Sequence, residues 1–165
     1  MEQTLAVIPQ PVTPFWQAFL AHAGLPEHTP LYETFAFSDN PADADALAAL
    51  VLAGRKTGTA SLAWEYGADR PLPRAGDYSL VIDWQGAPLC VIETQHVDLK
   101  PFDHVDAAFA AAEGEGEGEG DGSLATWREG HWQYFERLCA RMGWQASPGM
   151  IVVCERFRLV WPAQP

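Results

Sequence analysis

The segment from Met150 to Trp161 alternates between two kinds of side chain. Arg156 and Arg158 share one face, and the opposite face carries apolar residues at Ile151, Val153, Phe157, Leu159 and Trp161. This period of two predicts a long strand whose apolar face must be buried. The chain must therefore build a sheet around its C-terminal segment.

Other segments predict a mixture of strands and helices in no regular βαβ order. Cap-plus-proline pairs at Thr13-Pro14 and Asn40-Pro41 predict helices that end at Gly24 and Gly54. The remaining expected elements are helices over 102–112 and 124–142, short strands at 32–37 and from Leu62 to Trp64, and a hairpin of 78–84 with 87–94, whose second strand continues to Leu99. Asp121 or Ser123 should cap the last helix, and Gly143 should end it. We expect the α+β class, as a small mixed β-barrel decorated with helices, in one domain over 13–161 with tails at 1–12 and 162–165.

The charge of the chain argues against binding along a polyanion. Lysine and arginine number 10 against 22 acidic residues, a formal charge of −12. Such a chain repels a long nucleic acid unless its cations are clustered. A nucleotide-sized ligand, or a short RNA contact at one basic patch, remains compatible with the composition.

The cysteines and histidines predict neither a disulfide framework nor a metal site. Cys90, Cys139 and Cys154 are odd in number and widely spaced, so we expect buried free thiols in a reducing compartment. No metal and no cofactor are expected. The sequence has no signal region or membrane-spanning apolar run, and we expect a soluble cytoplasmic protein.

One short stretch, GRKTGTAS at residues 54–61, gathers cations and hydroxyl groups in this acidic chain. Lys56 at a helix C-terminus is favourable without any function, and Thr57 and Thr59 suit an ordinary strand or turn. Alternatively, a desolvated Lys56 acts as a base that activates the Thr59 hydroxyl. The local sequence leaves both interpretations open.

Two further segments have a structural and a functional interpretation. Glu-Gly repeats four times over 113–120, which is typical of a solvated linker but could also deliver a carboxylate to the following helix. In that helix, Trp127, His131 and Tyr134 share one flank. They suit either a packed core or the wall of a pocket for an aromatic ligand such as a nucleobase.

Taken together, these stretches resemble the ASCH domain family, which has a PUA-like fold. The resemblance covers nearly the whole chain from Phe15 to Val160. It rests on segments that include Leu50–Leu62, Gly76-Asp77, Pro88–Ile92, Pro101–Val105, Glu117–Asp121, Trp127-Arg128 and Val152–Phe157. The family is linked to RNA metabolism by its fold. Some small members look like amidohydrolases that deacylate N4-acetylcytidine, and others are described as RNA-cleaving nucleases.

The resemblance implies a cleft with the family's lysine and threonine at its mouth. By position these are Lys56 and Thr59, and the accompanying glutamate is expected at Glu119, with Glu117 next. Substrate-binding roles are expected for Arg55, Thr57, Ser61, Trp127, Arg128, His131 and Tyr134. We expect Lys56 to be an exposed pocket residue whose replacement by alanine hardly changes the thermal midpoint.

The early repeats of the Glu-Gly run should be mobile and dispensable at Glu113 and Glu115, because glycine leaves that backbone costly to order. These expectations describe a hydrolase acting on a modified nucleoside or short single-stranded RNA through Lys56, Thr59 and Glu119. The alternatives are a non-catalytic RNA-binding PUA-like module and an RNA-cleaving nuclease.

Overall fold

The computed structural model describes residues 11–114 and 122–162, and the N-terminal residues, 115–121 and the last three residues lie outside this description. The chain divides into two compact units. Unit 1 consists of Met1–Gly54, Pro73–Gln95 and Phe157–Pro165, and unit 2 consists of Arg55–Leu72 and His96–Arg156. Each unit is described by itself.

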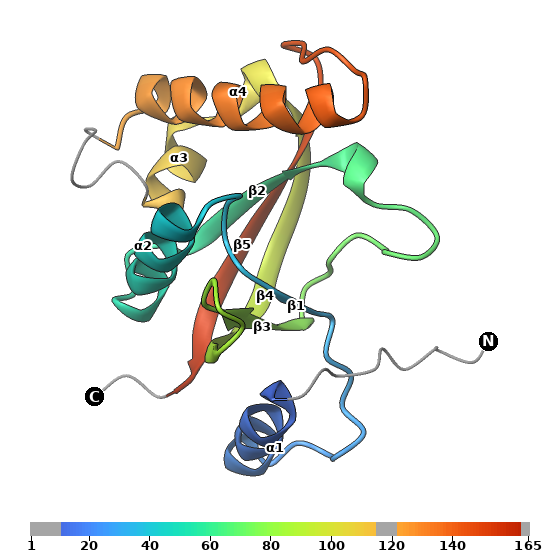
Figure 1. Cartoon of the computed structure of the whole chain (residues 1–165), viewed down its shortest axis with the longest axis vertical. Helices are drawn as coiled ribbons and strands as arrows, with labels where there is room; N and C mark the ends of the chain where they lie inside the picture. The colour runs from blue at the N-terminus through green and yellow to red at the C-terminus, as the bar shows by residue number, and fades with distance from the viewer. Residues whose placement is uncertain (1–10, 115–121, 163–165) are drawn as a thin grey trace. The chain divides into compact units, whose positions relative to one another are not determined.

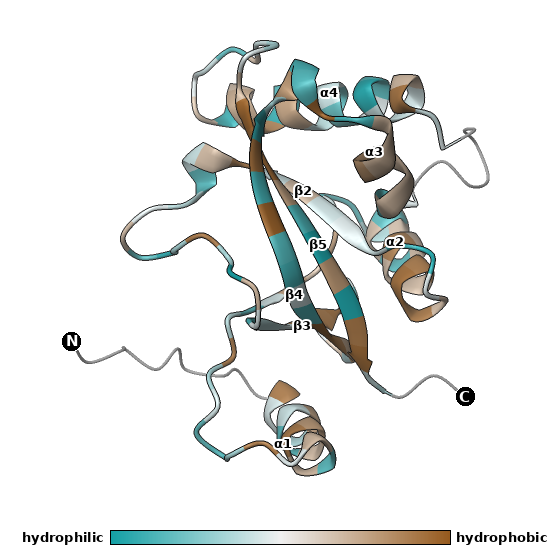
Figure 2. Ribbon diagram, turned by 180° about the vertical axis from the view of Figure 1, so that it is seen from behind, coloured by the Kyte–Doolittle hydropathy of each residue, from teal (hydrophilic) through white to brown (hydrophobic). Residues whose placement is uncertain are grey.

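The strands are β1 (Glu33–Phe35), β2 (Gly58–Leu62), β3 (Tyr78–Ile82), β4 (Pro88–Pro101) and β5 (Ile151–Trp161). They are hydrogen-bonded in the order β1-β3-β4-β5-β2. The β1–β3 pair is parallel, and the β3–β4 and β2–β5 pairs are antiparallel. The alternation that predicted β5 is visible as brown and teal bands along β4 and β5 in Figure 2.

Unit 1 carries the two N-terminal helices, α1 (Val12–Ala23) and α2 (Pro41–Leu52). The Asn40 side chain accepts a hydrogen bond from the Asp43 amide at 2.9 Å, and Pro41 follows at the first helical position, as predicted. Gly24 ends α1 in the left-handed conformation, also as predicted. The predicted cap at Thr13 is wrong, because the helix begins at Val12, two residues before the expected Pro14, and follows Pro11 without a side-chain cap.

Unit 2 carries the helices α3 (Ala107–Glu113) and α4 (Leu124–Arg141), which lie close together in Figure 1. The single helix expected over 102–112 is wrong, because a 3-10 turn at Phe102–His104 precedes a separate α3. Asp106 caps α3 by accepting from the Phe109 amide at 2.9 Å. This bond, followed by one from Lys100, lowers the pKa of the Asp106 carboxyl. Ser123 caps α4, one of the two caps predicted.

The core of unit 2 joins both helices to the sheet. Its buried residues are Leu62, Phe102, Val105, Phe109, Ala110, Trp127, Phe135, Cys139, Val152 and Cys154. Gly58 of β2 lies directly beneath α3, where a Cβ atom would be 3.4 Å from the Phe109 ring and 3.5 Å from Ala112. Glycine at this position therefore lets the helix approach the strand closely.

All three cysteines are free and buried, as the sequence predicted. Burial raises the pKa of the Cys90 and Cys154 thiols to about 12. Both thiols therefore remain protonated and unreactive at neutral pH. Within the described residues, no helix combines the length and apolar character needed to cross a membrane.

Among the glycines that the structure describes, Gly114 has the closest backbone neighbour. It ends α3 at φ 66°, and a Cβ atom there would lie 2.6 Å from the Arg55 carbonyl oxygen. Gly143, also in unit 2, has a similar φ of 72° but nothing within 4 Å of a Cβ. Both glycines therefore need a left-handed backbone conformation, but only Gly114 lacks room for a side chain.

We predict that Gly143→Ala lowers the free energy of unfolding by about 1–2 kcal/mol, the strain of a left-handed alanine. Gly114→Ala should lower it by a further 1 kcal/mol or more, about the cost of forcing an atom into a packed site. Chemical denaturation of both variants measures the difference. Equal losses would mean that the close approach of Gly114 to Arg55 is not rigid.

Candidate functional site

The start of β2 and the end of α3 are held together by backbone hydrogen bonding. The Thr57 amide donates to the Ala112 carbonyl at 2.7 Å, and the Thr57 hydroxyl donates to the same oxygen at 3.3 Å. Thr57 was expected to bind substrate, and here its hydroxyl fixes the end of α3. This attachment brings the neighbouring Lys56 and Glu113 face to face.

Lys56 is buried against the C-terminal end of α3. Its side chain is 1% exposed, and Nζ lies 3.4 Å from the Glu113 carbonyl oxygen and 3.5 Å from Glu113 Oε2. Both contacts place positive charge at the negative end of the helix dipole and against a carboxylate. The Glu113 side chain is also 1% exposed, so this is an ion pair out of water.

His131 of α4 completes the cluster. Its Nε2 atom lies 2.9 Å from Glu113 Oε2, and its Nδ1 atom lies 3.0 Å from the Trp127 carbonyl oxygen. A carbonyl only accepts, so Nδ1 must carry a hydrogen. The short contact between Nε2 and Oε2 then requires one proton, carried either by the imidazole or by the carboxyl group. Lys56, Glu113 and His131 are called the buried triad below.

Two expectations about these residues are wrong. Glu113 was expected to be mobile, but it ends α3 and is 0% exposed. Lys56 was expected to be exposed, but it is buried. The structure does not describe Glu115, Glu117 and Glu119. Glu119 is the carboxylate first assigned to the site. The signal that would have identified Glu113 is Gly114, which suits the residue after a helix end.

Thr59 and Ser61 alternate along β2 with Gly58, Ala60 and Leu62. Gly58 faces α3, and Ala60 and Leu62 pack in the core beneath the helices, so the two hydroxyls point to the other side of the strand. The Ser61 hydroxyl is 2.6 Å from that of Tyr66. Arg55 is exposed beside the triad. The nucleophilic role of Thr59 stays a prediction.

Trp127 and His131 form an aromatic stack within the core. Their rings are 4.1 Å apart at 14°, and Phe102 stacks on Trp127 at 5.5 Å and 29°. Trp127 is therefore packed among aromatic rings and is 5% exposed. Arg128 donates to the carbonyls of Asp103 at 3.0 Å and Val105 at 3.4 Å, which fixes the turn before α3.

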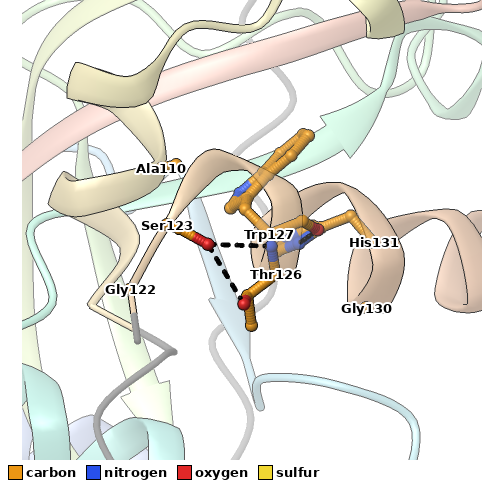
Figure 3. A pocket seen from close by; sticks show the side chains of 7 residues that line it. All are labelled: Ala110, Gly122, Ser123, Thr126, Trp127, Gly130 and His131. Carbon is orange, nitrogen blue, oxygen red and sulfur yellow. Dashed lines mark hydrogen bonds between the residues drawn. The ribbon is translucent and has the colours of Figure 1, made fainter. Parts of the chain in front are cut away.

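A small pocket of about 130 Å³ opens at the first turns of α4. It is lined by Ala110, Gly122, Ser123, Thr126, Trp127, Gly130 and His131 (Figure 3). Tyr134, the third aromatic residue of the predicted cluster, is not part of this lining and lies partly buried, 5.8 Å beneath the Arg137 guanidinium. His131 belongs both to the pocket and to the buried triad, so it connects the two.

Comparison with known proteins agrees with this architecture. A family model described as the ASCH domain matches residues 33–161. The solved ASCH domain from Lactobacillus crispatus JV V101 is 30% identical with a TM-score of 0.77, and the match covers 93% of this chain and 99% of that one. A solved protein from Enterococcus faecalis V583 is 34% identical with a TM-score of 0.79, over 91% of this chain and 90% of that one.

A comparison with curated proteins finds no match. The likeness to the two solved structures confirms the expected α+β, PUA-like fold. The match of the family model over most of the chain shows that this protein is a member of the ASCH domain family.

Proposed function

We propose that this protein is a hydrolase that cleaves the amide of a modified nucleoside of the N4-acylcytidine type. The observation that carries the proposal is the buried triad, in which a lysine, a glutamate and a histidine meet beside a pocket. Ionisable groups buried together are expensive for a fold, and they are common where an enzyme must hold a proton ready. The nucleoside class comes from the family resemblance.

In the proposed reaction, water adds its oxygen to the acyl carbon and the bond from that carbon to the base nitrogen breaks. The leaving nitrogen takes up a proton, and the products are a carboxylic acid and the free nucleoside. The proton shared by Glu113 Oε2 and His131 Nε2 is the one delivered, and one of the two protons of the attacking water returns to this pair, which restores it. Lys56 balances the carboxylate charge during this transfer. Glu113 thus takes the role that the sequence alone assigned to Glu119.

The first functional prediction separates chemistry from stability. Lys56→Met leaves the Glu113 carboxylate buried without its cation and should lower the free energy of unfolding by about 3–5 kcal/mol. The double variant Lys56→Met/Glu113→Gln removes both charges and should recover most of that loss. Both variants should hydrolyse N4-acetylcytidine about 10²–10⁴-fold more slowly, as measured by release of cytidine.

The control is Lys100→Met, which breaks a similar but partly exposed pair with Asp106 at 3.2 Å. We expect a loss of at most about 1 kcal/mol and unchanged turnover. Full activity in the stable double variant would make the triad a structural feature and would reject the proposed function.

Thr59 is tested separately. Because strand alternation directs its side chain away from α3, the geometry favours direct attack by water over attack by the Thr59 hydroxyl. Thr59→Val should therefore retain turnover of N4-acetylcytidine within a few-fold of the parent. A loss as large as that of Lys56→Met would instead assign the nucleophile to Thr59, as predicted from the sequence.

Salt dependence distinguishes a nucleoside hydrolase from an RNA-binding module. Several cations are engaged within the protein: Lys56 with Glu113, Lys100 with Asp106, and Arg158 with Glu93. We predict a Michaelis constant that changes little between low and high salt. An affinity for single-stranded RNA that falls by about 0.7 log units per log unit of salt for each of several phosphates would favour the RNA-binding alternative.

A further inference from the structure

Trp127, which lines the pocket at the start of α4, carries a hydrogen-bond donor without a partner among the described residues. Trp127 is 5% exposed, and its indole Nε1 atom is buried without a hydrogen-bond partner among the described residues. A buried donor in this state is costly, and most buried polar groups in proteins are paired. Figure 3 shows the Trp127 ring among the side chains that surround the pocket.

The stacking around Trp127 determines how a ligand can meet it. The His131 ring lies 4.1 Å from the indole at an angle of 14°, and the Phe102 ring lies 5.5 Å from it at 29°. Two rings stacked on the indole leave less of its face for a ligand, and its one polar group is the N–H on the edge. An edge donor of this kind binds an acceptor atom and does not stack on a nucleobase.

The remaining lining favours a neutral acceptor over an anion. Among the described lining residues there is no lysine or arginine. The one titratable side chain, His131, has its nitrogens against the Trp127 carbonyl and the Glu113 carboxylate. Ser123 caps α4 by accepting a hydrogen bond from the Thr126 amide at 3.2 Å. The N-terminal end of the helix dipole adds a weak positive potential there but no formal charge.

We infer that this pocket binds the acyl amide of the substrate, with the Trp127 N–H donating to the acyl carbonyl oxygen. The inference rests on the proposed function for the identity of that amide. Trp127 then stabilises the oxygen as it gains negative charge during attack by water. His131, which shares the proton with Glu113, lines the same pocket.

The test observes the indole N–H groups directly by ¹⁵N–¹H NMR, independently of turnover. The Trp127 signal is assigned by its loss in Trp127→Phe, which keeps an aromatic ring and removes the donor. Acetamide should shift this signal in a saturable manner, whereas acetate, which has the same shape but is charged, and inorganic phosphate should shift it much less. Trp64 is an internal control, because its Nε1 is also buried without a partner but lies outside the pocket lining.

Gly130 provides a second variant that does not depend on Trp127→Phe folding. Gly130 lines the pocket, and a Cβ atom there would meet nothing within 4 Å, so Gly130→Leu adds bulk to the pocket without a clash. It should abolish the acetamide shift. The matched control is Gly67→Leu, at an equally open glycine outside the pocket lining, which should leave the shift unchanged.

In the hydrolysis assay, Trp127→Phe should lower kcat for N4-acetylcytidine about 10²-fold with a smaller change in KM. If acetamide shifts the Trp127 signal but N4-acetylcytidine is not hydrolysed, the assignment of the Trp127 N–H to an acyl carbonyl, called the carbonyl site, stands and the proposed function fails. If acetamide leaves the Trp127 signal unmoved, or acetate or phosphate shifts it more, the carbonyl site is rejected whether or not turnover occurs.

Discussion

The contact between Lys56 and the end of α3 is the interaction on which unit 2 depends. It joins residues 57 positions apart, and it is reinforced by the two hydrogen bonds from Thr57 to Ala112 and by the close approach of Gly114 to Arg55. Because α3 packs against both β2 and α4, this attachment also sets the distance between Glu113 and His131. The geometry of the candidate site is therefore a direct consequence of how the helix is anchored.

An apolar pair in place of Lys56 and Glu113 would hold the end of α3 equally well. Buried ion pairs contribute little net stability, because the loss of hydration offsets most of the attraction between the charges. The chain nevertheless places one of its 10 basic residues here, where it is 1% exposed. A proton-transfer site requires such charges and a packing role does not, which is why the triad, and not the fold, carries the functional proposal.

Local sequence predicted those elements whose signals are local. The Asn40-Pro41 cap, the hairpin of β3 and β4 and the Ser123 cap all depend on a few adjacent residues, and the structure confirms them. The strand β5 is confirmed too, but the buried face expected from its alternation is wrong at its start, where Ile151 is exposed and residues 152–155 are all buried. Glu113 could not be placed in this way. It begins a repetitive Glu-Gly run, and its burial depends on Lys56 and His131, which are distant in sequence. The same distance explains why Lys56 was expected to be exposed.

The Lys56 ammonium stabilises the ionised form of the Glu113 carboxyl, whose Oε2 atom lies 3.5 Å from Nζ. The same oxygen lies 2.9 Å from His131 Nε2, so one carboxylate oxygen faces both side chains. Each of the two side chains also contacts a backbone oxygen, Lys56 that of Glu113 and His131 that of Trp127. In the function that we propose, this arrangement holds a proton beside the pocket whose indole N–H we assign to the substrate carbonyl.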